Sequence, residues 1–200
     1  MDEYEAWRLE RLRTGIRGET SKARGRRERE GWFARYAPEG KTGIDIGCQD
    51  DPLNHTFRRF DYVFGDGDAT EMAGVPENAF HTVYASHVLE HLKYPRKALS
   101  RWYAITAPGG HLIVCVPHRD LYEKRPSPPS RWNFEHTYFW LPDRSGPPGT
   151  KCLMEEIRAV APHADVVSYR TIDAGYDYTL GEEEHPVGEY SIEAVVLKPY

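Results

Sequence analysis

The stretch Gly43-Ile44-Asp45-Ile46-Gly47-Cys48 decides the fold of this 200-residue chain. Its β-compatible residues run into Gly47, as in a short buried strand that ends where the backbone can approach a ligand without an intervening Cβ. An acid inside such a strand is costly without partners, so we expect Asp45 to accept hydrogen bonds from the turn that follows. The motif is weak alone, and the segments that follow it give it weight.

Composition limits the class of protein. The length suits one domain with a full core, and 40% hydrophobic with 28% charged residues is typical of a globular chain. A net charge of -5 argues against bulk nucleic-acid binding. The cysteines are odd in number and widely spaced, which predicts reduced packing residues. No apolar run approaches the roughly 18 residues of a membrane span, and the acidic N-terminus is unlike a signal peptide. We expect a cytoplasmic protein without membrane contact.

Strand and helix patterns alternate after Gly47, which favours a doubly wound sheet. Residues 112–116 are consecutively apolar, as in a central parallel strand covered on both faces. Pro95 suits the first turn of a helix because it has no N–H to lose. We expect helices from Pro95 and over 152–161, and strands over 60–64, 82–85, 111–116, 166–172 and 191–197.

Residues 1–40 are rich in arginine and separate from the main domain over 41–200. Apolar spacing predicts one helix around Tyr4 to Ile16 and a second over 26–36, with Trp32, Phe33 and Tyr36 facing inward. Two interpretations stay open. The pair packs on the domain with its arginines in water, or it forms a lid over a cofactor or supplies counter-charge to an anionic substrate.

Two carboxylates follow the expected second strand, within residues 65–69. Asp66 lies 21 residues beyond Asp45. A carboxylate that ends the second strand of a nucleotide-binding sheet binds the ribose hydroxyls at about this interval. The alternative is a solvated acidic turn.

Short motifs follow the first at set distances. They are Asp45-Ile46-Gly47-Cys48, Gly67-Asp68-Ala69, Phe80, residues 86–92, Pro95 and Pro108-Gly109-Gly110-His111-Leu112. In this order and spacing they resemble the class I S-adenosylmethionine-dependent methyltransferases, especially the small type 11 branch. The resemblance runs from about Lys41 to Pro117.

The resemblance implies a compact Rossmann-like fold: one doubly wound, mostly parallel sheet whose last strand is antiparallel. It implies S-adenosyl-L-methionine as cofactor. The implied contacts are Asp45, Gly47 and Cys48 at the methionine part, Asp66 at the ribose diol, Asp68 and Ala69 at the adenine edge, and Ser86 and His87 beside the sulfonium.

The chain departs from the family pattern twice. Gln49 and Asp51 stand where further glycines are expected, so the turn should be wider. Few residues separate the ribose and adenine contacts, so we expect the usual helix and strand between strands 2 and 4 to be missing. The choice between Asp66 and Asp68 for the ribose stays open.

His87-Val88-Leu89-Glu90-His91 also matches the His-x-x-Glu-His pattern of inverted zinc peptidases, with the Glu155-Glu156 pair as a source of the third ligand. The pattern directly follows a strand, however, and the same string closes the fourth strand in the methyltransferases. We therefore expect no metal here and a structural role for His91.

Residues 118–150 are predicted to form a substrate-loop insertion. The segment leaves the carboxyl end of a central strand, where open α/β sheets bind ligands, and it is longer than a connector needs. If the methyl acceptor is a hydroxyl, a base must take its proton, and histidine suits that task near neutral pH. Our candidates are His118, then His136, with Asp120 or Glu135 orienting the imidazole.

Alternatives to these roles also stay open. Each histidine could instead be hydrogen-bonded locally within its loop. His118, Asp120 and His136 could also bind a metal ion, but their spacing in the sequence matches no defined metal-binding pattern. The expected substrate-binding residues are Tyr122, Trp132, Asn133 and Glu135.

We therefore expect a methyltransferase that acts on a hydroxyl or amine of a small molecule, such as a sugar or a natural-product intermediate. The alternative is a catalytically silent relative that binds cofactor or a partner protein, because the turn at residues 49–51 is altered. Nucleic-acid modification, suggested by the arginine-rich start, would require strongly salt-dependent binding and suits an acidic chain poorly. A homodimer is compatible with the sequence.

Overall fold

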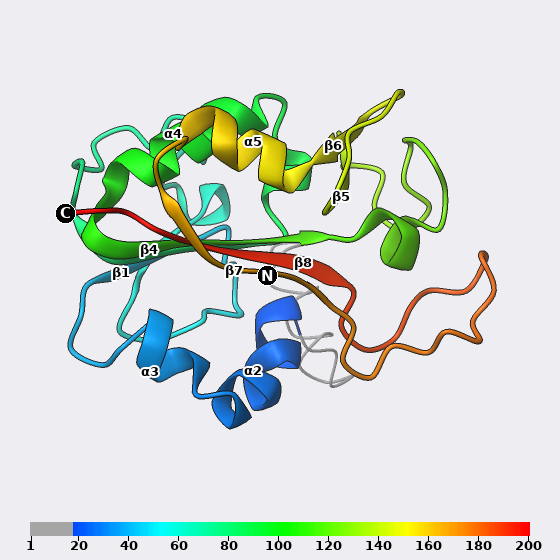
Figure 1. The fold of residues 1–200 in the computed structure, drawn as a ribbon, viewed down its shortest axis with the longest axis horizontal. Coiled ribbons are helices and arrows are strands. Elements are labelled where there is room, and N and C mark those ends of the chain that lie inside the picture. The colour runs from blue at the N-terminus through cyan, green and yellow to red at the C-terminus, as the bar shows by residue number, and fades with distance from the viewer. Residues whose placement is uncertain (1–17) are drawn as a thin grey trace.

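The computed structural model of the protein describes residues 18–200, so the helix expected around Tyr4 to Ile16 lies outside the described part. A six-stranded sheet forms the centre, in the order β2-β1-β3-β4-β8-β7 (Figure 1). β1, β2, β3 and β4 are mutually parallel, whereas β8 runs antiparallel to both of its neighbours. This confirms the doubly wound sheet with an antiparallel last strand. The strands are β1 (Gly43–Ile46), β2 (Arg58–Phe60), β3 (Phe80–Ser86), β4 (Thr106–Pro117), β7 (Asp165–Ile172) and β8 (Ser191–Leu197).

Helices cover both faces of the sheet. α4 (Pro95–Ile105) and α5 (Leu153–Val160) lie on one face, and α2 (Glu19–Arg29) and α3 (Trp32–Tyr36) lie on the other (Figure 1). Side chains alternate along β4: Leu112 and Val114 join the core beneath α4 and α5, whereas Ile113 packs in the cluster around Trp32. This two-sided burial explains the unbroken apolar run. A small parallel pair, β5 (Phe139–Leu141) and β6 (Thr150–Cys152), lies between β4 and β7 in the chain.

The second strand is shorter than expected. β2 ends at Phe60, and Tyr62–Phe64 forms a 3-10 turn, not a strand over 60–64. The Asp61 carboxylate accepts a hydrogen bond from the Val63 N–H at 3.0 Å, and this cap favours a turn over the extended chain. Between Phe60 and Phe80 the structure contains only turns, as the shortened region predicted, and β2 is therefore an edge strand.

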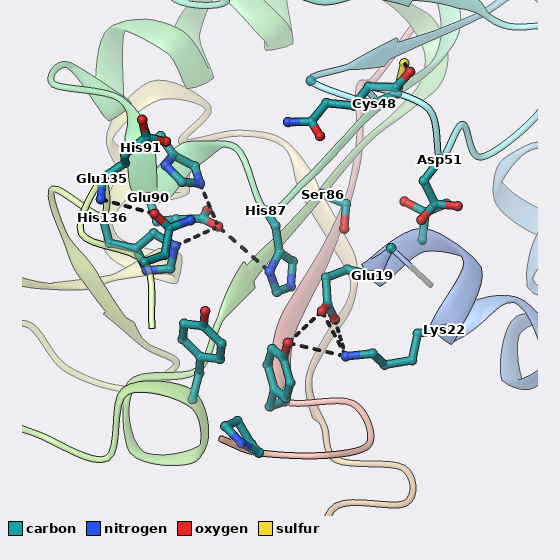
Figure 2. Close-up of a pocket in the computed structure, with 18 of the residues that line it drawn as sticks. Glu19, Lys22, Cys48, Asp51, Ser86, His87, Glu90, His91, Glu135 and His136 are labelled. Atoms are coloured by element: carbon teal, nitrogen blue, oxygen red, sulfur yellow. Dashed lines mark hydrogen bonds and ion pairs between the residues drawn. The ribbon is translucent and has the colours of Figure 1, made fainter. Parts of the chain in front are cut away.

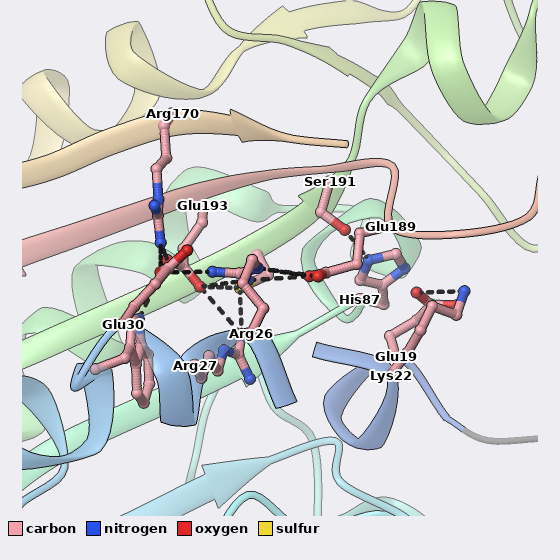
Figure 3. A network of polar contacts seen from close by, with 12 residues as sticks. Glu19, Lys22, Arg26, Arg27, Glu30, His87, Arg170, Glu189, Ser191 and Glu193 are labelled. Atoms are coloured by element: carbon pink, nitrogen blue, oxygen red, sulfur yellow. Dashed lines mark hydrogen bonds and ion pairs between the residues drawn. The ribbon is translucent and has the colours of Figure 1, made fainter. Parts of the chain in front are cut away.

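A buried polar network attaches α2 to the sheet (Figure 3). The predicted helix over 26–36 is two helices, because Gly31 adopts a φ of +64° and ends α2. The Arg27 guanidinium is buried and bonds to Glu193 at 3.1 Å and to the Tyr84 hydroxyl at 2.8 Å. The expectation that these arginines lie in water is therefore wrong for Arg27. Trp32 donates its indole N–H to the other Glu193 oxygen at 3.2 Å.

Cysteine and membrane predictions can also be compared with the structure. Cys48, Cys115 and Cys152 are free and buried, as expected of packing residues. Within residues 18–200, every helix is too short or too polar to cross a bilayer.

Candidate active site

A pocket of about 680 Å³ opens at the carboxyl ends of β1 and β3 (Figure 2). Five segments that are distant in sequence line it: the start of α2, the turn after β1, the end of β3, the loop after β4, and the connection between β7 and β8. Strand ends of a parallel sheet meet at one edge, and this explains why β1 and β3 contribute together.

The turn after β1 is built as the sequence predicted. Asp45 is buried and accepts a hydrogen bond from the Leu53 N–H at 2.7 Å, which confirms the expected partner. Burial raises the pKa of Asp45 to about 8. Gly47 has a φ of +69°, and a Cβ there would lie 2.3 Å from Cγ2 of Val88. Only glycine fits this turn without strain.

The residues that replace the expected glycines have structural partners. Gln49 adopts a φ of +45° and donates its N–H to Asp61 at 2.9 Å. Asp51 accepts a hydrogen bond from the Ser21 N–H at 2.9 Å, which ties the start of α2 to the turn. The turn is therefore linked to β2 on one side and to α2 on the other.

Five of the eight predicted cofactor residues line the pocket, and three do not. Those that line it are Asp45, Gly47, Cys48, Ser86 and His87. Asp66 instead accepts a hydrogen bond from the Asp61 N–H at 3.0 Å, Asp68 from the Thr70 N–H at 2.6 Å, and the Ala69 carbonyl from the Trp102 indole at 2.9 Å.

Asp61 is the acid that directly follows β2, and sequence reasoning missed it. Its side chain is buried between the Gln49 and Val63 N–H groups. The signal was present in the sequence, because Asp61 interrupts the run from Phe60 to Phe64 that we expected to be a strand.

Three histidines surround a buried carboxylate at the far end of the pocket (Figure 2). Glu90 is fully buried, and its Oε1 lies 3.8 Å from Nδ1 of His87, 3.8 Å from Nε2 of His91 and 3.9 Å from Nε2 of His136. Burial raises the pKa of Glu90 to about 7 and lowers the pKa values of His87 and His91 to about 4 each. We name Glu90, His91 and His136 the histidine–glutamate cluster.

His136 differs from the other two histidines in its electrostatics. Burial alone would lower its pKa, but the Glu123 hydrogen bond and the Glu90 charge raise the pKa above its ordinary value. Its Nδ1 lies 2.6 Å from Oε1 of Glu123, itself a buried residue of the π-helical turn Arg119–Glu123.

The loop after β4 contributes part of the set that we predicted from it. Tyr122, Asn133, Glu135 and His136 line the pocket. Trp132 does not, because its indole N–H donates to the Tyr122 carbonyl at 2.9 Å.

His118 and Asp120 also lie outside the pocket lining. His118 caps the π-helical turn, and its Nδ1 accepts the Asp120 N–H at 3.2 Å, while Asp120 pairs with Arg119. This is the local hydrogen bonding that stood as the alternative for His118. The set His118, Asp120 and His136 is not brought together; His136 instead meets Glu90 and His91.

The start of α2 supplies pocket residues that sequence reasoning did not identify. Glu19 accepts hydrogen bonds from the Tyr190 hydroxyl at 2.6 Å and from Lys22 at 2.8 Å. Burial opposes ionisation of Glu19, but His87 and Lys22 lower its pKa below the ordinary value. The start of α2 thus forms one side of the pocket (Figure 2).

Comparison with known proteins identifies the family. A family model described as a methyltransferase domain matches residues 22–146. No curated protein matches the sequence significantly.

Three solved structures resemble the chain in fold. A complex between the Haloferax volcanii Trm112 methyltransferase activator and a candidate methyltransferase matches at 13% identity and a TM-score of 0.60, covering 100% of this chain and 97% of that one. An Archaeoglobus fulgidus S-adenosylmethionine-dependent methyltransferase matches at 13% identity and a TM-score of 0.56, covering 98% of this chain and 100% of that one. The cyclase SpnF matches at 14% identity and a TM-score of 0.56, covering 87% of this chain and 81% of that one. At such identities the likeness concerns the fold alone.

Proposed function

Because this chain belongs to the methyltransferase domain family and is a class I S-adenosylmethionine-dependent methyltransferase, we propose that its methyl acceptor is a small molecule with a hydroxyl or amine. One observation carries the proposal: a single pocket joins the turn after β1 to the polar side chains of the loop after β4. Cofactor and acceptor would therefore meet inside one pocket.

The lining suits the cofactor's charge. Among the described lining residues, Glu19, Asp50, Asp51 and Glu135 are acidic, whereas Lys22 carries the fixed positive charge. A ligand with a sulfonium and an ammonium group is attracted by such walls. Gly47 forms part of this wall, where a Cβ would clash with Val88. We assign the cofactor's methionine end to Asp45, Gly47 and Cys48, with Ser86 and His87 toward the sulfonium.

The bound cofactor supplies an electrophilic methyl group, and the protein's own residues orient the acceptor. Tyr122, Asn133 and Glu135 line the end of the pocket beyond His87 and offer one aromatic face with amide and carboxylate groups. Holding two reactants in line within a site that excludes water supplies most of the rate enhancement expected of such a transfer. The histidine–glutamate cluster lies beside these residues, at the end of the pocket where the acceptor would be held.

We propose that residues 118–150 form the acceptor-binding segment and that residues 1–40 cap the pocket, since α2 contributes Glu19 and Lys22 to it.

Transfer of a radiolabelled methyl group tests the acceptor class. The protein is incubated with labelled S-adenosylmethionine and a cell extract that has been separated into small molecules, nucleic acid and protein. We expect label in the small-molecule fraction. Asn133→Ala should lower that transfer at least tenfold with unchanged affinity for S-adenosylhomocysteine, measured by calorimetry. His163→Ala, an exposed histidine outside the pocket, should leave transfer unchanged. Label confined to protein or nucleic acid would overturn the proposal.

A further inference from the structure

Glu90 is a buried carboxyl group without hydrogen bonds to the described residues. The side chain is fully buried, and neither carboxylate oxygen has a hydrogen-bond partner among residues 18–200. An unpaired buried carboxylate is costly, and proteins commonly offset that cost with a bound cation or a protonated partner. Imidazole nitrogens of His87, His91 and His136 lie 3.8 to 3.9 Å from its Oε1, beyond hydrogen-bond distance. The space between these atoms therefore lacks a group that would satisfy the Glu90 carboxylate.

Three potential ligand atoms face one another across that space. Oε1 of Glu90, a ring nitrogen of His91 and a ring nitrogen of His136 all lie within 4.8 Å of one another. Bonds of about 2.1 Å to a tetrahedral ion would place such atoms about 3.4 Å apart. The observed separations of 3.8 and 3.9 Å from Glu90 need to close by only about half an ångström.

The outer partners hold His136 as a metal ligand is usually held. Its Nδ1 bonds to Oε1 of the buried Glu123 at 2.6 Å, which leaves Nε2 directed toward Glu90. A carboxylate behind the ligating imidazole fixes the tautomer and the ring orientation at metal sites.

Backbone hydrogen bonds fix the relative position of the two segments. The Thr137 N–H donates to the Glu90 carbonyl at 2.8 Å, and the Thr137 hydroxyl donates to the His91 carbonyl at 3.0 Å. The cluster is therefore preorganised by the fold.

We propose that Glu90, His91 and His136 bind one divalent transition-metal ion of the zinc type. Two imidazoles and one carboxylate are the protein ligands of many catalytic zinc sites, which keep a fourth position open. Here His91 and Glu90 line the pocket, so that position faces its interior. It would take an oxygen donor of the methyl acceptor, and this last clause alone rests on the proposed function. The sequence prediction of no metal is replaced by this proposal.

Metal titration of the full chain tests the site directly. The protein is freed of metal with a chelator and titrated with Zn²⁺ by calorimetry and with Co²⁺ by visible absorption. We expect one ion per chain at micromolar affinity or tighter, with the intense Co²⁺ bands of a tetrahedral site. His91→Ala and Glu90→Gln should each weaken Zn²⁺ binding at least 100-fold. Glu123→Gln, which changes only the group behind His136, should weaken it about 10- to 100-fold.

Control variants and a second ligand make the result decisive. His163→Ala removes an exposed histidine and should bind Zn²⁺ like the wild type. S-adenosylhomocysteine binding without metal reports on the proposed function and on folding of each variant. Absence of Zn²⁺ binding by a chain that still binds S-adenosylhomocysteine would overturn the metal site alone. Equal Zn²⁺ affinity in wild type, His91→Ala and Glu90→Gln would overturn it as well.

Discussion

Asp45 links the chemistry of one residue to the stability of the fold. Its pKa is raised to about 8, first by burial and further by Asp51 and Asp61, while the Leu53 N–H and Arg27 oppose the shift. The folded protein therefore holds a proton that the unfolded chain, with an ordinary aspartate pKa near 4, releases at about pH 5 and above. The stability that Asp45 contributes is fully present below the pKa of Asp45 in the unfolded chain. It is lost as the pH rises toward the folded-state pKa of about 8.

Asp45→Asn should remove this pH dependence. The asparagine oxygen can still accept the Leu53 N–H, but the side chain carries no proton to lose. The free energy of unfolding of the variant minus that of the wild type should be at least about 1 kcal/mol larger at pH 8 than at pH 5. Urea unfolding at pH 5, 6.5 and 8 measures it, with the exposed Asp165→Asn as control. Parallel pH curves for wild type and Asp45→Asn would contradict the prediction.

At the scale of elements, α2 is held to the sheet by charge as well as by apolar packing. Arg27 lies between Glu193 and Tyr84, and its guanidinium stacks over Trp32 at 4.7 Å (Figure 3). Glu193 is almost fully buried on β8, so its charge depends on these partners. A buried ion pair itself adds little to stability. Removing one partner is nevertheless costly, because the other charge stays buried without it.

Arg27→Met should lower the free energy of unfolding by about 3 kcal/mol, since Glu193 remains buried after its partner is lost. Adding Glu193→Gln should restore part of the loss, because the amide needs no counter-charge. Equilibrium urea unfolding of both variants gives the two values. Arg29→Met, on the exposed face of the same helix, should change stability by less than about 0.5 kcal/mol. Equal losses for Arg27→Met and Arg29→Met would show that the buried pair does not anchor α2.

For the whole molecule, the pocket couples segments from both ends of the chain. Glu19 in α2 and Tyr190 before β8 share a hydrogen bond at 2.6 Å, and both line the pocket with the turn after β1. A ligand bound there would contact α2 together with the strand ends at the sheet edge. Ligand binding should therefore stabilise the molecule as a unit.

S-adenosylhomocysteine at 100 times its dissociation constant should add about 2.7 kcal/mol to the stability of the fold. For a domain of this size the melting temperature should rise by roughly 5–10 °C. Hydrogen exchange in the same complex should slow at the amides of α2 as well as in the turn after β1. Slower exchange confined to the turn would show that α2 is not a cap.

The sequence by itself determined the sheet and part of the pocket lining. Unbroken apolar runs mark buried parallel strands, and the ends of such strands meet at one edge. Asp45, Gly47, Ser86 and His87, which the family resemblance implied as cofactor contacts, lie at that edge and line the pocket. The edge position of β2 was also predictable, because too few residues follow it for another helix and strand.

Only the tertiary structure decided which loop residues enter the pocket. His136 faces Glu90 because the Thr137 N–H bonds to the Glu90 carbonyl and Glu123 holds the imidazole, and both partners are distant in sequence. His118 has the same chemistry but caps a turn outside the pocket. Local patterns encode strands and helices, whereas the direction of a loop side chain depends on contacts that form after distant segments pack.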